Sequence, residues 1–385
     1  MKILLIGEYS GLHNSLKDGL QLNGHTVTLL GTGDGFKRYP VDILIKSTFF
    51  EIPIFKFIAK IIDKIFKVSL NDIEIGIKTF FKIKKLKGFD IVQLVNENSF
   101  KTTPILEVKL IKIIKNNNKN IFLLSCGTDF KSIQYALNKN FRYSILTPYF
   151  NNKKLKNSYR HILKYNNKHF KNLHEYIYKN IKGVISSDLD YHIPLKKEIK
   201  YLGMIPNPIN LSKIKYNKLK IDGEIIIFHG INIKNSIKKG NNYFQKSMKI
   251  IKELHGNKIK YIEVKNLNYN DYVKSYDSCH IFLDQVYAYD QGYNALEAMA
   301  KGKVVFTGAE KEWLDHYNLI EDSIAINALP ETNYLVNKLT DLINNPEKIE
   351  SISVNARKFI ENHHDFKSIA SIYEDKWLKA LKNEK

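Results

Sequence analysis

Short apolar runs alternate with amphipathic segments along the whole chain. Residues 2–7 form the first run, which ends in Gly as a buried parallel strand often does. A helix over 15–22 and a strand over 24–30 complete a β-α-β unit. Comparable strands are expected at 89–95, 120–125, 183–188, 223–229, 260–264 and 278–284, and helices near 73–87, 104–116, 241–254, 333–344, 346–361 and 365–381. The pattern predicts an α/β protein with doubly wound parallel sheets.

The periodic pattern breaks at Pro206-Asn-Pro208-Ile-Asn, which indicates a hinge between two domains. A chain of 385 residues is long enough for two cores, because a single core stops growing near roughly 250 to 300 residues. We therefore expect a first domain over 1–205 and a second over 206–364, followed by a terminal helix over 365–385.

The stretch from Asp290 to Gly308 is the most informative segment of the chain. It reads as a Gly-containing turn, a helix rich in Ala, Leu, Glu and Met, a Gly stop and an apolar strand. A helix that opens directly after Gly292 presents free backbone N–H groups and a positive dipole end, which suits a diphosphate. Glu297, inside that helix, suits sugar hydroxyls. The alternative is a structural helix whose Glu297 faces water.

A second anion-binding arrangement precedes this stretch in the same half. A strand runs into a turn at His229-Gly230, and Lys238-Lys239-Gly240 stands before the next helix. Lys239 can therefore reach a phosphate as a point charge beside a helix start.

Polar residues also follow strands of the first half, at the edge where doubly wound folds bind ligands. His13 lies in the loop after the first strand, and Asp129 lies in the loop after the strand at 120–125. Both are candidates for a cleft, although His13 also fits an ordinary loop histidine and Asp129 fits a helix N-cap. Gly31-Thr-Gly-Asp-Gly35 lacks the spacing of a nucleotide fingerprint and is expected to be a turn.

The number of cysteines and the hydropathy pattern indicate the cellular compartment. Two cysteines, Cys126 and Cys279, leave no basis for a disulfide framework or a metal cluster, so a reducing cytoplasm is expected. The first apolar run is too short, and too soon followed by Glu8, for a signal peptide. No run approaches the ~20 apolar residues of a membrane span.

The net charge of +21 is unevenly distributed. Residues 1–200 carry 34 Lys and Arg against 16 Asp and Glu, a balance of +18, whereas the remainder has a balance of +3. An AT-rich genome also encodes many Lys and Asn residues, but this bias would raise the Lys content of both halves. We therefore favour a functional asymmetry, in which the first half faces nucleic acid or an acidic membrane surface.

Two basic segments allow opposite interpretations. Lysines recur at helical spacing beside a wide apolar face within 52–70, at Lys56, Lys60, Lys64 and Lys67. Such a helix can lie in a membrane interface. It can equally pack onto a sheet with a solvated Lys stripe, which is the commoner case and the one we favour. Residues 152–182 mix aromatic and basic residues as single-stranded nucleic acid sites do, but no RNA or DNA module signature appears there.

The assembled motifs resemble the retaining GT-B glycosyltransferases, a large bacterial family that uses nucleotide-sugar donors. The similarity covers essentially the whole length and rests on Gly7-Glu-Tyr-Ser-Gly-Leu-His13, Gly24-His-Thr-Val, Pro206-Asn-Pro-Ile-Asn, the His229-Gly and Lys239-Gly240 pairs and, most specifically, Gly292-Tyr-Asn-Ala-Leu-Glu297-Ala-Met-Ala-Lys-Gly302. The resemblance implies two Rossmann-like domains that face a cleft. The first would bind the acceptor and the second the donor, with the terminal helix crossing back to the first.

The resemblance also implies roles for single residues. The donor nucleotide site would comprise Glu297 at the ribose, Gly292, Tyr293 and Asn294 at the diphosphate turn, and Lys239, His229 and Gly230 beside the phosphates. The family pattern has a second Glu eight positions before Glu297, where this chain has Tyr289. Asp290, or the backbone nearby, is expected to take over its role of positioning the sugar, and Asp290 joins His13 and Asp129 as a candidate catalytic residue. The family's frequent Arg before the Lys-Gly pair is also missing from the turn at 229–234.

The resemblance implies a hexosyltransferase that moves a sugar from a nucleoside diphosphate sugar to a cell-envelope glycan or lipid-linked acceptor, with retention at the anomeric carbon. No metal or other cofactor is expected, because a helix end, Lys239 and N–H groups can stabilise the departing diphosphate. Two alternatives stay open: a nucleotide-sugar epimerase on the same fold, and a non-catalytic basic module that binds nucleic acid or membrane. The expected location is the cytoplasm or the inner face of the cell membrane.

Overall fold

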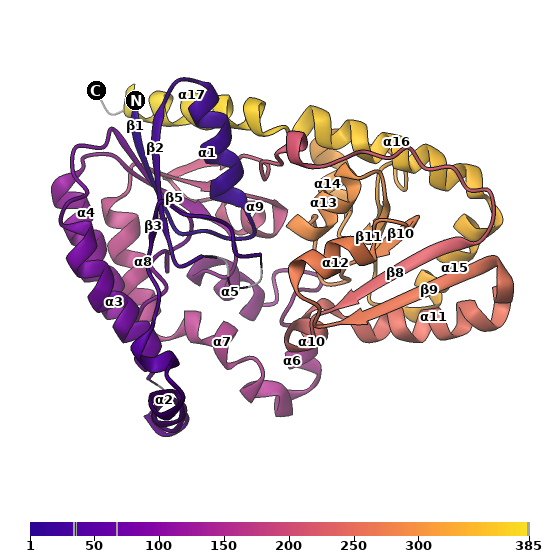
Figure 1. Cartoon of the computed structure of the whole chain (residues 1–385), viewed down its shortest axis with the longest axis horizontal. Helices are drawn as coiled ribbons and strands as arrows, with labels where there is room; N and C mark the ends of the chain where they lie inside the picture. The colour runs from indigo at the N-terminus through magenta and orange to yellow at the C-terminus, as the bar shows by residue number, and fades with distance from the viewer. Residues whose placement is uncertain (34, 36, 67, 383–385) are drawn as a thin grey trace.

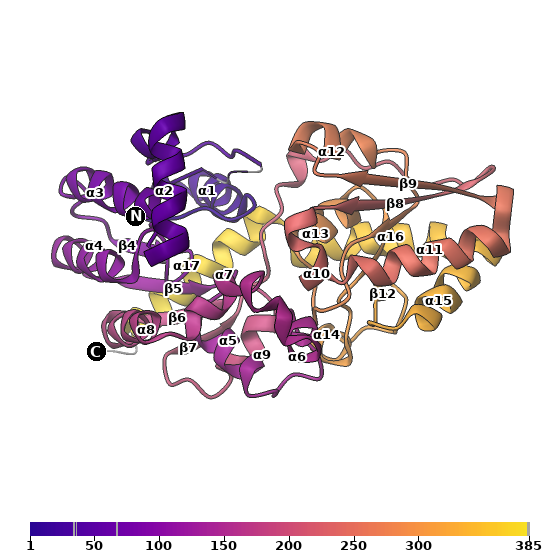
Figure 2. The ribbon, with the colours of Figure 1, turned by 90° about the horizontal axis from the view of Figure 1, so that it is seen from below.

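The computed structural model describes residues 1–33, 35, 37–66 and 68–382. The chain forms two lobes, each built on a parallel sheet, which lie side by side in Figure 1. The lobes meet where α6 (Thr147–Asn151) and α9 (Leu189–Leu195) of the first lie beside α10 (Ser236–Lys239) and α14 (Lys311–Tyr317) of the second (Figure 2). The predicted α/β class with doubly wound sheets is confirmed.

The first lobe is organised around a sheet with the order β3-β2-β1-β4-β5-β6-β7. In the inner strand β1, Ile3 pairs with Val27 of β2 on one side and with Ile91 of β4 on the other. The strands β4, β5 and β6 are buried along their whole length, because helices cover both faces of the sheet. The strand bounds are β1 Lys2–Ile6, β2 Thr26–Gly31, β3 Ile43–Leu44, β4 Ile91–Leu94, β5 Ile121–Ser125, β6 Gly183–Ser186 and β7 Tyr201–Met204.

Two helices of the first lobe begin at residues that suit a helix start. Pro104 opens α4, where its missing N–H costs no hydrogen bond, and the Asn167 side chain accepts the N–H of Phe170 at the start of α8. The remaining helix bounds are α1 Leu12–Leu22, α2 Pro53–Phe66, α3 Leu70–Ile83, α4 Pro104–Asn117, α5 Phe130–Leu137, α7 Arg160–Leu163 and α8 Lys168–Asn180.

The second lobe has a sheet with the order β12-β11-β10-β8-β9. Its strands are β8 Ile225–Ile231, β9 Ile259–Lys265, β10 Ile281–Leu283, β11 Val304–Thr307 and β12 Ile326–Asn327. Its further helices are α11 Asn241–His255, α12 Tyr269–Ser275, α13 Tyr293–Ala300, α15 Thr332–Asn344 and α16 Pro346–His363. Every residue of α13 from Ala295 to Ala300 is buried, as expected of a helix that lacks a polar stripe.

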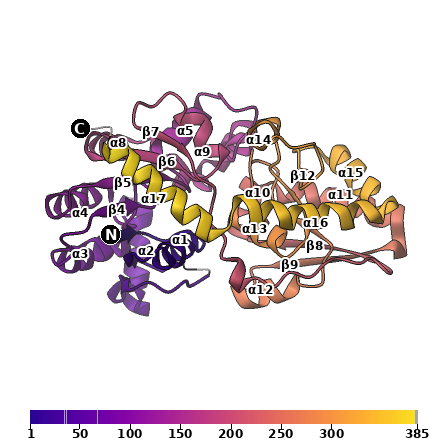
Figure 3. The ribbon, with the colours of Figure 1, turned by 90° about the horizontal axis from the view of Figure 1, so that it is seen from above.

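The last helix, α17 (Phe366–Lys382), leaves the second lobe and packs on α1 of the first (Figure 3). The segment that leads into α17 is hydrogen-bonded to the segment around Ile209, which follows the first lobe. Ile209 N donates to the His364 carbonyl at 2.7 Å, and Phe366 N donates to the Ile209 carbonyl at 3.2 Å. Trp377 is fully buried against the first sheet, and its Nε1 donates to Gln93 Oε1 at 3.0 Å.

The structure contradicts one predicted turn and describes only part of another. The turn expected at His229-Gly230 is wrong, because β8 continues in register with β9 as far as Ile231. The turn expected over Gly31–Gly35 begins where β2 ends, at Gly31, but Asp34 lies outside the described residues.

The favoured interpretation of the amphipathic segment is also wrong. Residues 53–66 form α2, but the wide apolar face does not pack onto the sheet: within this helix only Ala59 is buried. Phe57 is 66% exposed and Ile65 is 62% exposed. Helical periodicity identified the apolar face correctly and could not say what covers it. Lys67 lies outside the described residues.

Candidate functional site

The predicted donor site is built on α13, which begins close to the first lobe. Gly292 is the N-cap residue, with an extended backbone at φ −80° and ψ 169°, and its carbonyl accepts the N–H of Leu296 at 3.0 Å. Tyr293 follows, and its hydroxyl donates to the Pro208 carbonyl at 2.9 Å. Glu297 comes one turn later and is only 8% exposed. A carboxylate at this depth needs a partner.

The partner of Glu297 comes from the other lobe. Lys37 Nζ donates to Glu297 Oε1 at 2.7 Å, and the hydroxyls of Tyr39 and Tyr269 donate to the same carboxylate at 3.3 Å. The Lys37 ammonium also lies 5.2 Å from the ring centre of Tyr269 and 5.5 Å from that of Tyr293. The alternative in which Glu297 faces water is therefore excluded, since the side chain is enclosed by a cation and aromatic rings.

His229 and Gly230 lie inside β8. The imidazole of His229 is fully buried, between the Tyr261 hydroxyl at 2.9 Å from Nδ1 and Asn241 Nδ2 at 2.8 Å from Nε2. Burial lowers the pKa of His229 to about 4, so the ring is neutral at pH 7. A Cβ at Gly230 would collide with the Tyr272 ring, so glycine lets α12 approach the strand.

Lys239 ends α10, directly before Gly240, whose φ of 68° favours glycine. Its Nζ donates to Asp284 Oδ1 at 2.6 Å, and its carbonyl accepts the N–H of Val286 at 3.0 Å. Asp284 follows β10 and opens the loop that leads to Gly292. Through Asp284 and Val286, Lys239 is therefore held at the carboxyl edge of the sheet, next to the loop that leads into α13.

Both candidates from the first lobe are buried, and His13, which was expected in a loop, lies in the first turn of α1. His13 is fully buried, with Nδ1 2.7 Å from the Gly7 carbonyl, and burial lowers its pKa to about 4. Asp129 is the N-cap of α5: its Oδ1 accepts the N–H of Ser132 at 2.7 Å, and its Oδ2 accepts the Ser125 hydroxyl. The N-cap interpretation describes Asp129 in this structure, and the catalytic roles of both residues stay predictions.

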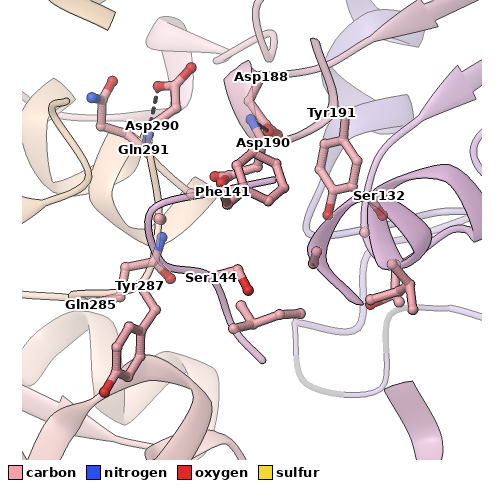
Figure 4. Close-up of a pocket in the computed structure, with 17 residues that line it drawn as sticks. Ser132, Phe141, Ser144, Asp188, Asp190, Tyr191, Gln285, Tyr287, Asp290 and Gln291 are labelled. Carbon is pink, nitrogen blue, oxygen red and sulfur yellow. Dashed lines mark hydrogen bonds between the residues drawn. The ribbon is translucent and has the colours of Figure 1, made fainter. Parts of the chain in front are cut away.

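A cavity of about 190 Å³ lies between the lobes (Figure 4). Its walls are α5 with the segments before and after it, the start of α9 in the first lobe, and the loop before α13 in the second. Asp290 and Gly292 both line it, whereas neither His13 nor Glu297 is among the lining residues. The structure thus brings Asp290 and Gly292 together at one cavity.

Three carboxyl groups share the wall of this cavity: Asp188, Asp190 and Asp290. Asp290 accepts the N–H of Leu189 at 3.2 Å and that of Gln291 at 2.6 Å, so a residue of the second lobe meets the start of α9 in the first. Burial raises the pKa of Asp290 to about 6. Burial and then repulsion by the neighbouring carboxylates raise the pKa of Asp188 and of Asp190 as well.

Tyr289 stands where the family pattern has its first Glu. Its hydroxyl accepts the N–H of Arg142 at 2.8 Å, and the Arg142 guanidinium lies 4.8 Å from the ring centre. The same guanidinium donates to Glu310 and Glu312 at 2.6 Å. The side chain of Tyr289, 2% exposed, is therefore engaged in the contact between the lobes.

Sequence reasoning missed Lys37, Asp188 and Asp190. Lys37 follows a Gly-rich loop without periodicity, and the contact with Glu297 spans 260 positions. Asp188 ends the segment 183–188, which reads as a strand and its loop, and Asp190 follows it; polar residues at such a place are shared with many loops.

The comparisons with known proteins agree on the fold. Residues 242–375 match the family described as glycosyl transferase-like. The comparison with curated proteins gave no match. Sucrose-phosphate synthase from Thermosynechococcus elongatus is similar over 100% of both chains, with 13% identity and a TM-score of 0.63. Anabaena HepE, solved in complex with UDP-glucose, is similar over 100% of both chains, with 12% identity and a TM-score of 0.58.

A third similar structure is an epimerase. UDP-GlcNAc 2-epimerase from Neisseria meningitidis, solved bound to UDP-GlcNAc, matches 98% of this chain and 100% of its own, with 13% identity and a TM-score of 0.53. At such low identities these structures bear on the fold alone. The resemblance noted in the sequence is confirmed at that level: the chain has the two-lobed GT-B fold, and residues 242–375 of the chain are similar to the glycosyl transferase-like family.

Proposed function

We propose that this protein transfers a sugar from a nucleoside diphosphate sugar to an acceptor, with retention at the anomeric carbon. The observation that carries the proposal is the buried carboxylate of Glu297 on α13, one turn after the helix start at Gly292. It lies in the lobe whose sequence is glycosyl transferase-like. HepE, which has this fold, was solved with UDP-glucose, and this supports a nucleotide-sugar donor here.

The donor diphosphate lies, in this proposal, at the start of α13. The first N–H groups of a helix have no partner within it and carry the positive end of the dipole. Lys239 adds a full positive charge from the same edge of the sheet, where Asp284 holds it at 2.6 Å. Phosphate binding at this edge would give Lys239 a second anionic partner.

The ribose hydroxyls bind Glu297, since an ionised carboxylate accepts several hydrogen bonds and donates none. Lys37 occupies one of its oxygens in this structure, at 2.7 Å. Donor binding therefore exchanges a partner of Glu297 from the first lobe for a hydroxyl of the nucleotide. This exchange couples the donor site to the contact between the lobes.

In the transfer step the bond from the anomeric carbon to the diphosphate oxygen breaks, and a bond to the acceptor oxygen forms on the same face. The departing phosphate takes the acceptor proton, so no protein base is required. The dipole of α13 and Lys239 stabilise the negative charge that develops, and we propose no obligatory metal. The acceptor approaches from the first lobe, across the cavity that Asp290 lines.

The test is a thermal-shift series with nucleoside diphosphates and their sugars. We expect at least one to raise Tm, because a ligand at 100 times its Kd stabilises by about 2.7 kcal/mol. Glu297→Gln should remove most of this increase. Glu253→Gln, an exposed position on α11 of the same lobe, is the matched control and should keep it. An unchanged increase in Glu297→Gln, or no response to any nucleotide, contradicts the proposal.

A second candidate, a nucleotide-sugar epimerase, is favoured by one observation. Buried carboxyl groups with raised pKa values, such as Asp290 at about 6, can take and give protons near neutral pH, as an epimerase requires. The fold is also that of UDP-GlcNAc 2-epimerase. Product analysis separates the two, since an epimerase changes the sugar nucleotide in the absence of any acceptor and a transferase releases the nucleoside diphosphate.

A further inference from the structure

The helix α2 contacts the rest of the protein along only part of its circumference. At about 100° per residue, Phe55, Ala59, Ile62 and Asp63 share one face. Ala59 is buried, Phe55 stacks on Phe49 with ring centres 4.1 Å apart, and Asp63 pairs with Arg160 at 2.7 Å. This face holds α2 to the first lobe, and the other two thirds of the helix are exposed.

The second face of α2 is apolar and exposed. We define the α2 apolar stripe as the residues with exposures of 72%, 66%, 42%, 42% and 62%, which are Ile54, Phe57, Ile58, Ile61 and Ile65. They fall within about 100° of one another over three turns. A single exposed isoleucine is ordinary, whereas a contiguous apolar stripe marks an interaction surface.

The third face is basic. Lys56, Lys60 and Lys64 lie about 120° from the centre of the stripe and are all exposed. Lys56 pairs with Glu51 at 2.6 Å, but both side chains are about half exposed, so the pair contributes little to stability. The lysines border the stripe along Phe57. They add to the first half of the chain, whose charge balance is +18.

We propose that α2 docks the protein onto an anionic lipid bilayer. The helix lies in the plane of the interface, with the α2 apolar stripe among the acyl chains and the lysines at the acidic headgroups. In the described ranges no helix has the length and apolar character of a membrane span, so the contact is peripheral. Figure 1 shows α2 at the lower tip of the first lobe, opposite α17, where a flat surface can reach it.

Charge and area favour a bilayer over a second copy of this chain. Two copies paired through α2 would bring two rows of lysines together, which is repulsive. A helix of 14 residues is about 21 Å long, so its stripe offers ~200 Å² per copy. Stable interfaces bury about 800 Å² per partner. An anionic surface supplies both the apolar medium and the opposite charge.

The test is co-sedimentation with vesicles of phosphatidylglycerol and phosphatidylcholine, compared with phosphatidylcholine alone. We expect binding to the mixed vesicles only, weakened in 0.5 M NaCl. The triple variant Lys56→Gln, Lys60→Gln, Lys64→Gln should lower partitioning on the order of 100-fold, since each lysine contributes about fivefold. Phe57→Ser with Ile65→Ser should also abolish most of the binding, because the apolar anchor is lost.

Matched controls come from the second lobe. Lys246→Gln with Lys249→Gln and Lys252→Gln on α11 makes the same charge change, and Leu254→Ser with Ile320→Ser removes apolar groups that are 63% and 80% exposed. Both controls should bind vesicles like the parent. Equal binding to neutral vesicles, equal loss in the controls, or a concentration-dependent dimer that Phe57→Ser dissociates without vesicle binding would overturn the proposal. The nucleotide thermal shift is unaffected by either result, so the two proposals fail separately.

Discussion

Three acidic side chains from both lobes, Asp188, Asp190 and Asp290, meet at one buried wall. The folded protein holds protons on them to a higher pH than the unfolded chain does, because burial raises their pKa values. A group with a raised carboxyl pKa contributes stability below its unfolded value, near 3.9, and loses that contribution as the pH rises through its folded value, here about 6 for Asp290.

Asp290→Asn should therefore flatten the pH dependence of stability. From pH 4 to pH 7 the parent should lose up to about 3 kcal/mol of unfolding free energy relative to the variant. Urea unfolding at both pH values measures the difference. Asp375→Asn, an exposed position on α17, should leave the slope unchanged. Parallel pH profiles for the parent and Asp290→Asn would show that Asp290 is ionised in the fold throughout this range.

The ion pair between Lys37 and Glu297 joins the lobes in a buried setting, with exposed side-chain fractions of 2% and 10%. Lys37→Met leaves the carboxylate uncompensated and should lower the unfolding free energy by about 3 to 5 kcal/mol. Glu297→Gln in the same chain should restore part of this loss. Lys348→Met removes an ion pair to Asp341 in which the two side chains are 49% and 51% exposed, and it should cost about 1 kcal/mol or less. Equal losses in Lys37→Met and Lys348→Met would contradict the burial argument.

At the scale of elements, the contact of α1 with α17 depends on Gly19. A Cβ at this position would collide with the Phe366 carbonyl and the Ala370 side chain. Alanine is about 1 kcal/mol better than glycine inside a helix, but the clash with backbone outweighs this gain. Gly19→Ala should therefore destabilise by about 1 to 3 kcal/mol, measured by urea unfolding. Gly223→Ala, where the added methyl meets nothing within 4 Å, should stay near neutral, and a stabilised Gly19→Ala would contradict this packing.

Some elements of the fold could be predicted from the sequence, and others could not. The Gly stop and the Ala-rich pattern located α13 and its Glu297, and the apolar run located β1, because local periodicity and caps determine such elements. The prediction that the apolar face of α2 packs onto the sheet is wrong, because periodicity identifies an apolar face but does not say what it packs against. Lys37 and Asp188 were missed, because their partners lie in the other lobe and leave no local pattern.

For the whole molecule, Trp377 on α17 ties the end of the chain to the first sheet. Trp377→Ala should lower stability by about 3 to 5 kcal/mol, since the side chain is fully buried and donates to Gln93. Limited proteolysis should then cut the first lobe before the second. Trp313→Ala, equally buried but within the second lobe, should reverse that order. The same fragment order in both variants would mean that the lobes unfold as one unit.

The return of α17 to the first lobe has a consequence for synthesis on the ribosome. The sheet β1 to β7 emerges early, yet the surface around Gln93 stays uncovered until residues 366–382 have been translated. At cellular elongation rates the second lobe takes on the order of ten seconds to make. During that interval the nascent first lobe exposes the apolar surface that α17 later covers. We expect a holdase chaperone to bind this surface.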